Sequence, residues 1–91
     1  MTDNIKKYPC PCCGNVTLTE EPPGTFVVCP VCYWEDDAAQ FEDQALAGGA
    51  NVVSLEQARK NFKAFGACEI GCAEYVRKPL ASEKSTMRKL L

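Results

Sequence analysis

The residues best suited to chemistry are four cysteines arranged as two pairs. Two residues separate Cys10 from Cys13, Cys29 and Cys32 repeat that spacing, and fifteen residues lie between the pairs. This is the spacing of four-cysteine zinc sites, because a two-residue gap lets one tight turn aim both sulfurs at an ion about 2.3 Å away. Iron accepts the same thiolates, but paired cysteine turns are the ordinary setting of structural zinc. The sequence therefore predicts one structural Zn²⁺, with iron as the alternative.

The two cysteine turns are near copies of each other. They read Cys10-Pro11-Cys12-Cys13-Gly14 and Cys29-Pro30-Val31-Cys32-Tyr33. Proline after the first cysteine presets each turn, since its φ is fixed near roughly −65°. Gly14 suits the left-handed conformation that often follows such a turn, whereas Tyr33 at the matching position would be strained there. We therefore expect the two turns to differ.

Three further cysteines are not needed for this site. Cys12 adjoins Cys13, which makes it a poor substitute for Cys10 as a ligand. Cys68 and Cys72 are four residues apart and could share a helix face, but a second metal site would need other ligands, and the chain has no histidine. Ordinary core or surface thiols are the favoured interpretation, with a redox or metal-storage role as the alternative.

A polar cluster follows the second cysteine turn directly. After Trp34 come the three carboxylates of Glu35, Asp36 and Asp37. These groups could bind a cation, act as acid and base, or meet a basic partner. The competing interpretation is a helix cap, because Asp37 and Gln40 match a capping box at the start of a helix that Gly48-Gly49 would stop. Trp34 is interpreted as a lid over the metal turns.

The segments between and after the cysteines predict the elements that hold them. Residues 16–19 and 26–28 favour strands on either side of the turn signal at residues 22–25, which predicts a β-hairpin between the cysteine pairs. Ser54 and Gln57 form a second capping-box match, and an apolar stripe then predicts a helix over 55–65 that ends at Gly66. This helix should cover Leu18, Phe26 and Val28. A shorter helix is expected within 67–78.

These elements make a small α+β fold: a zinc-ribbon β-hairpin with two Cys-x2-Cys knuckles, covered by one or two amphipathic helices. At 91 residues the chain should form one domain. We expect residues 8–79 to form that domain, with a flexible N-terminus at 1–7 and a mobile charged tail at 80–91. On the covering helix, Arg59 should lie close enough to reach Asp36 or Asp37.

Charge is divided sharply along the chain, although the net charge is only −2. Between Tyr8 and Ala58 there are eight acidic residues and no lysine or arginine, whereas the residues from Arg59 onward are basic by +5. No signal-peptide pattern or membrane-length apolar stretch is visible, so we expect a reduced, cytoplasmic, soluble protein without a membrane partner.

Several motifs occur together within residues 8–67. They are the two cysteine turns with the run to Asp37, Pro22-Pro23-Gly24-Thr25, Gly48-Gly49-Ala50-Asn51, Ser54-Leu55, Ala58-Arg59 and Asn61-Phe62. This combination resembles the CPCC-type cysteine-rich family of small bacterial proteins. The family resemblance implies metal binding without a defined role. It also implies that Trp34, Asp36, Asp37, Asn51, Arg59 and Asn61 belong to the family's motif. Asn51 has the alternative role of holding the turn before the helix.

Three functions are compatible with these features. The first is a structural-zinc protein that acts as a small acidic protein-binding module for a basic protein partner. The second is a metal-dependent, hydrolase-like enzyme that uses Glu35, Asp36 and Asp37 beside Asn51 and Arg59, although the lack of histidine counts against it. The third is nucleic-acid binding. Only the basic C-terminal third could provide it, because the cysteine-bearing half has no lysine or arginine and would repel phosphates.

Overall fold

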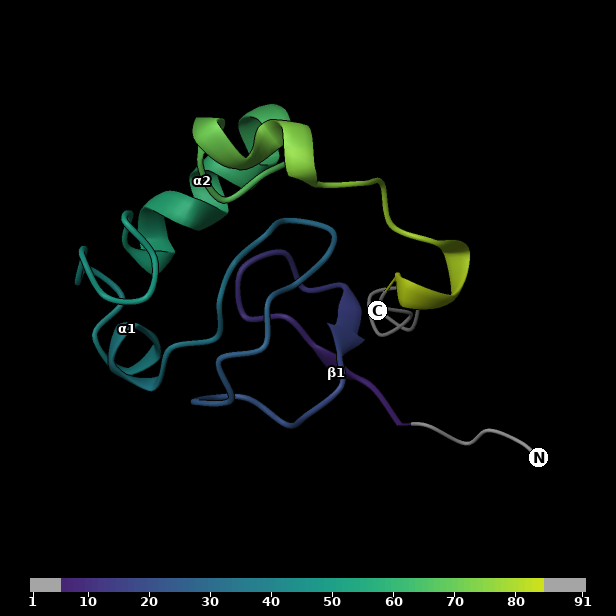
Figure 1. Ribbon diagram of the computed structural model, residues 1–91, viewed down its shortest axis with the longest axis horizontal. Coiled ribbons are helices and arrows are strands. Elements are labelled where there is room, and N and C mark those ends of the chain that lie inside the picture. The colour runs from purple at the N-terminus through teal and green to yellow at the C-terminus, as the bar shows by residue number, and fades with distance from the viewer. Residues whose placement is uncertain (1–5, 85–91) are drawn as a thin grey trace, which may run out of the picture.

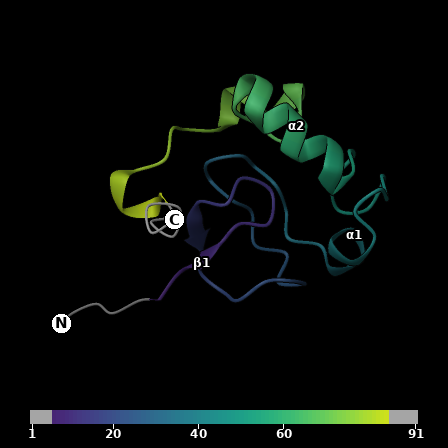
Figure 2. The same cartoon turned by 180° about the vertical axis from the view of Figure 1, so that it is seen from behind.

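The computed structural model describes residues 6–84 and shows a small α+β fold (Figure 1). The elements in chain order are β1 (Tyr8–Pro9), β2 (Val16–Leu18), α1 (Ala38–Glu42), α2 (Leu55–Phe65) and the 3-10 helices η1 (Ile70–Tyr75) and η2 (Ala81–Glu83). Helices α2 and η1 lie side by side above the cysteine-bearing loops in both views (Figures 1 and 2). The predictions for residues 1–5 and 85–91 lie outside the described residues.

The strand pairing differs from the sequence-based prediction. Strand β1 pairs antiparallel with β2, with Tyr8 opposite Leu18, so the hairpin encloses the first cysteine turn. Residues 26–28 do not join it, and Val28 instead makes a single bridge to Glu35 across the second cysteine turn. The predicted hairpin between the two pairs was therefore wrong. The residues on either side of each cysteine turn pair with each other. Strand propensity alone does not predict which segments pair.

Helix α2 was predicted correctly, including both of its ends. The Ser54 hydroxyl accepts a hydrogen bond from the Gln57 backbone N–H at 3.1 Å, which caps the first turn. Gly66 ends the helix in the left-handed conformation at a φ of 84°. Leu55 and Ala58 are fully buried on the inner face. Leu18 is buried in the same core cluster as these two residues, and the helical element in contact with its strand is η2.

Two other residues expected beneath α2 are not covered. Phe26 is 59% exposed and Val28 is 40% exposed, because the segment that carries them turns away from the sheet. In that segment the Phe26 backbone N–H donates to the Asp36 carbonyl at 2.9 Å, which pairs it with the chain beyond the second turn. The core instead gathers around the cysteines, Val31, Trp34 and the inner face of α2.

Helix α1 is shorter than predicted but begins where the capping signal placed it. Asp37 Oδ1 accepts from the Ala39 and Gln40 backbone N–H groups, at 2.8 and 3.3 Å. The helix ends at Glu42, well before the expected stop at Gly48-Gly49. The chain leaves the helix early because Gln40 turns inward and binds the following loop, as described below.

The residues after η1 form structure where a tail was predicted from residue 80. Glu83 in η2 is only 5% exposed, and its carboxylate accepts two hydrogen bonds from Arg77, each 2.8 Å long. It also accepts the Leu80 backbone N–H at 2.9 Å. Helix η2 in turn contacts β2, so residues 81–83 form a short helix within the segment predicted to be a tail. Among the described residues, no helix combines the length and apolar character that a membrane span requires.

Candidate metal centre

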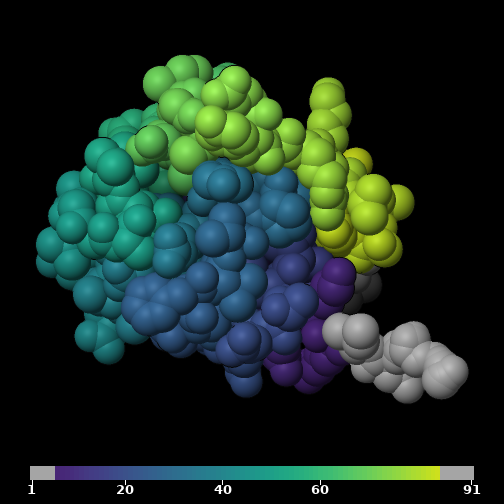
Figure 3. Space-filling model, in the orientation of Figure 1, coloured from purple at the N-terminus to yellow at the C-terminus, as the bar shows by residue number. Residues whose placement is uncertain are grey.

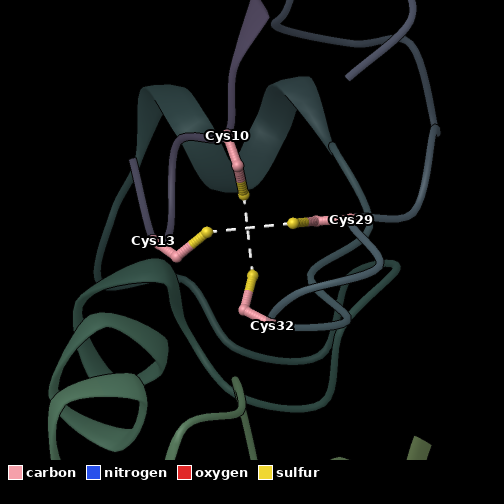
Figure 4. A group of neighbouring side chains, drawn as sticks. All are labelled: Cys10, Cys13, Cys29 and Cys32. Atoms are coloured by element: carbon pink, nitrogen blue, oxygen red, sulfur yellow. Dashed lines mark hydrogen bonds between the residues drawn. The ribbon is translucent and has the colours of Figure 1, made fainter. Parts of the chain in front are cut away.

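The four paired cysteines meet at one point, although they come from two separate turns. Their sulfur atoms all lie within 4.8 Å of one another. Cys10 Sγ lies 3.6 Å from Cys32 Sγ, and Cys13 Sγ lies 3.8 Å from Cys29 Sγ, so each contact joins the two turns (Figure 4). A tetrahedron with arms of about 2.3 Å has edges of about 3.8 Å, which is the geometry of zinc or iron bound by four thiolates. The residues present therefore fit a tetrahedral metal ion.

The two turns have the same backbone geometry. The Gly14 N–H donates to the Cys10 carbonyl at 2.8 Å, and the Tyr33 N–H donates to the Cys29 carbonyl at 2.7 Å. Gly14 has a φ of 80° and Tyr33 a φ of 72°. The expected difference between the two turns was therefore wrong, whereas the strain expected at Tyr33 is present. The left-handed conformation is required at this position of both turns, and Tyr33 adopts it despite the steric cost of its Cβ.

Backbone N–H groups and a hydroxyl point at the sulfurs. The Cys12 N–H lies 3.4 Å from Cys10 Sγ, and the Val31 N–H lies 3.4 Å from Cys29 Sγ, at matching positions of the two turns. The Thr17 hydroxyl contacts Cys29 Sγ at 3.0 Å. Such donors stabilise the ionised form of a thiol and orient it, which is the role of the groups around metal ligands.

Without a metal ion, the contacts among the four thiols push their pKa values in opposite directions. Contacts from Cys10, then Cys13 and Cys32, lower the pKa of Cys29, whereas contacts led by that of Cys10 raise the pKa of Cys32. Four thiolates cannot be ionised together at this distance without a cation, because each negative charge disfavours the next. A divalent ion would remove that conflict and allow all four to deprotonate.

Cations lie beside the cluster on one side. Arg59, Lys63 and Lys84 line a hollow of about 540 Å³ that also exposes part of Cys13. The Arg59 guanidinium donates to the Pro11 carbonyl at 3.0 Å and to Gln44 Oε1 at 2.8 Å. It therefore ties α2 to the first cysteine turn and does not reach Asp36 or Asp37, contrary to the prediction. These positive charges are placed to offset the negative charge of the thiolates.

The three consecutive carboxylates after Trp34 point in three different directions. Asp36 is fully buried and accepts the Thr25 N–H at 3.0 Å and the Thr25 hydroxyl at 2.8 Å, while its Oδ1 has no partner among the described residues. Asp37 caps α1, and its Oδ2 accepts the Ala50 N–H at 2.8 Å. Hydrogen bonds led by that of Ala50 lower the pKa of Asp37. Glu35 lines a separate small pocket.

The other predicted functional residues are mainly inside the protein. Trp34 is 1% exposed and packs in the same buried cluster as the paired cysteines, as a lid would. Asn51 is buried as well. Its side chain accepts the Glu35 N–H at 2.9 Å and donates to the Glu35 carbonyl at 2.7 Å, so it holds the chain after the second turn. Trp34, Asp36 and Asn51 therefore contribute little to the protein surface.

Gln40 is the structural residue that the sequence did not reveal. Its Nε2 donates to the Leu46, Asn51 and Val53 carbonyls at 3.0 to 3.2 Å, and its Oε1 accepts the Asn51 backbone N–H at 3.1 Å and the Asn51 side-chain amide at 2.9 Å. The sequence indicated only its place in a capping box. One fully buried amide thus organises the whole loop between α1 and α2.

The three extra cysteines lie outside the four-sulfur cluster. Cys12 and Cys68 are buried, and Cys72 is partly buried. Burial, followed by the charge of Glu69, raises the pKa of Cys72. The Cys68 backbone N–H donates to the Cys32 carbonyl at 2.8 Å, which fastens the chain after α2 to the second turn. Within residues 6–84, the Cys10, Cys13, Cys29 and Cys32 group is the only set of three or more side chains close enough to share a metal ion.

Comparison with known proteins agrees with this geometry. None of the curated proteins matches the chain. The family model described as "Cysteine-rich CPCC" matches residues 8–83, which include both cysteine turns, α1, α2, η1 and η2. The match extends past the residues that carry the motifs and ends at Glu83, the buried carboxylate of η2. The chain therefore belongs to the cysteine-rich CPCC family.

Proposed function

We propose that this chain is a structural-zinc protein of the zinc-ribbon type, whose acidic surface binds a basic protein. The observation that carries the first half is the four-sulfur cluster with edges of 3.6 and 3.8 Å. A closed shell of four thiolates leaves no open position for water, so the ion stabilises the fold and takes no part in catalysis. Zinc is the proposed metal, because Zn²⁺ is the ion usually bound by four cysteine thiolates in structural sites and it has no redox chemistry.

Cobalt substitution tests the metal site. Co²⁺ bound by four thiolates in a tetrahedron absorbs strongly in the visible range, and Zn²⁺ displaces it with loss of that absorption. We expect the metal-free chain to take up one Co²⁺ with this spectrum. Cys13→Ser should weaken binding and change the spectrum, because one thiolate is lost. Cys72→Ser is the matched control and should leave both unchanged, since that sulfur lies outside the cluster. A spectrum without four-thiolate features would contradict the proposal.

The second half rests on the distribution of charge. Between Tyr8 and Ala58 the chain has acidic residues but no lysine or arginine. The exposed acidic residues of this half are Glu20, Glu21, Glu42, Asp43 and Glu56. A bound Zn²⁺ with four thiolates adds a further charge of −2 to the same half. Acidic surfaces of this kind attract basic proteins and accelerate their association. Binding to polylysine that weakens steeply with salt is expected, and binding that ignores salt would contradict it.

Neither alternative function has comparable support. A hydrolase-like centre would need Glu35, Asp36 and Asp37 to converge, but one lines a pocket, one is buried under Thr25 and one caps α1. Nucleic-acid binding would use the basic C-terminal third. In that third, Arg59 is occupied by Pro11 and Gln44, and Arg77 is paired with Glu83.

A further inference from the structure

The small pocket behind the second cysteine turn is lined by carboxylates and apolar side chains without a basic residue. Its volume is about 150 Å³, and Val28, Tyr33, Glu35, Val52, Glu69 and Cys72 are among the residues that line it. This volume is smaller than that of a typical small-molecule site, so the pocket suits a single side chain. Figure 3 shows the segments that supply these residues meeting on one face: blue near 28–35, teal near 50–52 and green near 69–72.

The pocket has two carboxylates that form no ion pair with any residue the structure describes. Among residues 6–84 the one ion pair joins Arg77 to Glu83, so neither Glu35 nor Glu69 is paired within that range. The field of Glu69 reaches the pocket wall, because that charge is a cause, after burial, of the raised pKa of Cys72. Tyr33, which lines the pocket, is the last residue of the second cysteine turn, and the thiolates of that turn add negative potential to the same place.

Several large apolar side chains around the pocket are exposed to solvent. Val52 is 72% exposed, Ile70 is 71% exposed and Tyr75 is 60% exposed. The Tyr75 ring lies 5.5 Å from the ring of Tyr33, centroid to centroid, so these aromatic groups form one continuous border. Clustered apolar side chains with a charged centre are typical of protein-binding surfaces.

The position of Glu35 is fixed before any ligand binds. The Asn51 side chain holds both the N–H and the carbonyl of Glu35, and Gln40 in turn holds Asn51. The Glu35 carboxylate is half-buried and makes no hydrogen bond with the described residues. The backbone of Glu35 is thus held in place while its carboxylate has no internal partner. This is the arrangement expected of a pre-organised binding group.

We propose that this pocket receives a single cationic side chain, flanked by apolar residues, from the basic protein that binds the acidic surface. The apolar walls accept the aliphatic stem of an arginine or lysine, while Glu35 and Glu69 receive its charged head. The inference rests on the proposed protein-binding function and names the place and the chemistry of that contact.

Two short peptides test the proposal on the zinc-loaded protein. One is acetyl-Ala-Leu-Arg-Leu-Ala-amide, and the other replaces arginine with citrulline, which keeps the shape but removes the charge. NMR titration should show the arginine peptide shifting the amide signals of Tyr33, Glu35 and Val52, with binding at least fivefold tighter than the citrulline peptide. Equal binding of the two peptides, or shifts confined to α2, would overturn the proposal.

Paired variants separate the pocket from general charge. The double variant Glu35→Gln with Glu69→Gln should weaken the arginine peptide at least fivefold. The control compares two single variants: Glu69→Gln should weaken the arginine peptide, whereas Glu74→Gln, which removes one exposed carboxylate outside the pocket, should change its binding less than twofold. The cobalt spectrum verifies that these variants keep the fold. Equal losses in the two single variants would refute the pocket.

A polylysine arm distinguishes failure of the pocket from failure of the proposed function. If polylysine binds with strong salt dependence but the pocket variants leave the arginine peptide unaffected, the pocket inference is wrong and the acidic protein-binding surface stands. If neither polylysine nor the arginine peptide binds, the protein-binding function itself is wrong, and the pocket inference falls with it.

Discussion

Gly14 and Tyr33 occupy the same position in two successive cysteine turns and share one backbone conformation, with φ values of 80° and 72°. Each donates its N–H to the carbonyl of the first cysteine of its turn. Glycine adopts this conformation freely, whereas a residue with a Cβ is disfavoured there by roughly 1 to 2 kcal/mol. The geometry of the cysteine turns therefore outweighs the preference of tyrosine for a negative φ.

This relationship predicts the effect of Gly14→Ala. No atom lies within 4 Å of the position that an alanine Cβ would occupy, so the only cost is that of the left-handed backbone. We expect the zinc-loaded protein to lose about 1 kcal/mol of unfolding free energy. Denaturant unfolding at saturating zinc measures it.

Gly71→Ala is the matched control for that prediction. Gly71 lies in η1 at an ordinary φ, and its nearest contact, Glu69 Oε2 at 3.5 Å, leaves room for a methyl group. This variant should be neutral or slightly more stable, because alanine restricts the unfolded chain. The same loss in both variants would show that φ at Gly14 is not the cause.

Gln40→Ala should be the most damaging substitution outside the metal centre. It removes the amide that holds three loop carbonyls and the Asn51 side chain, and it leaves buried polar groups without partners. A loss of about 3 kcal/mol of unfolding free energy is expected from such a network. Gln57→Ala, on the exposed face of α2, should cost less than about 0.5 kcal/mol. Similar melting temperatures for the two variants would contradict the role of Gln40.

The ion pair at the C-terminal end predicts a pH dependence. Hydrogen bonds from Arg77, more than any other cause, lower the pKa of Glu83 from its usual 4.5 to about 2. A lowered pKa means that the folded state favours the ionised form, so this stabilisation is complete above pH 4.5 and is lost as the pH falls toward 2.

Comparing the wild type with Glu83→Gln isolates this contribution, because protonation of the cysteines affects both proteins alike. The difference in their unfolding free energies should be constant between pH 6 and pH 8 and should shrink below pH 4.5. A difference that grows on acidification would show that the Glu83 carboxylate does not stabilise the fold in its ionised form.

The sequence predicted those parts of the fold whose signals are local. Spacing and proline identified the four cysteines, and the caps at Ser54 and Gly66 fixed both ends of α2. Each of these signals acts over a few residues. The pairing of β1 with β2 escaped prediction because strand propensity does not choose a partner, and the cysteine turns made that choice.

The remaining differences depend on tertiary contacts. Gln40 is a polar residue on a short helix, and only its position beneath the 46–53 loop makes its burial favourable. Arg59 was expected to reach the carboxylate of Asp36 or Asp37. With α2 in place beside the first cysteine turn, its guanidinium instead binds the Pro11 carbonyl and Gln44. Pairings between residues distant in sequence are set by packing, so neither contact could be read from the chain alone.

The most direct test of the account is thermal unfolding of the zinc-loaded protein with and without a strong chelator, with the metal content measured on the same samples. We predict one Zn²⁺ per chain, a cooperative transition in its presence, and loss of that transition when the chelator removes the ion, with recovery on adding zinc. A chain that contains no stoichiometric metal, or that keeps its melting temperature after the metal is removed, would contradict the claim that one ion holds this fold together.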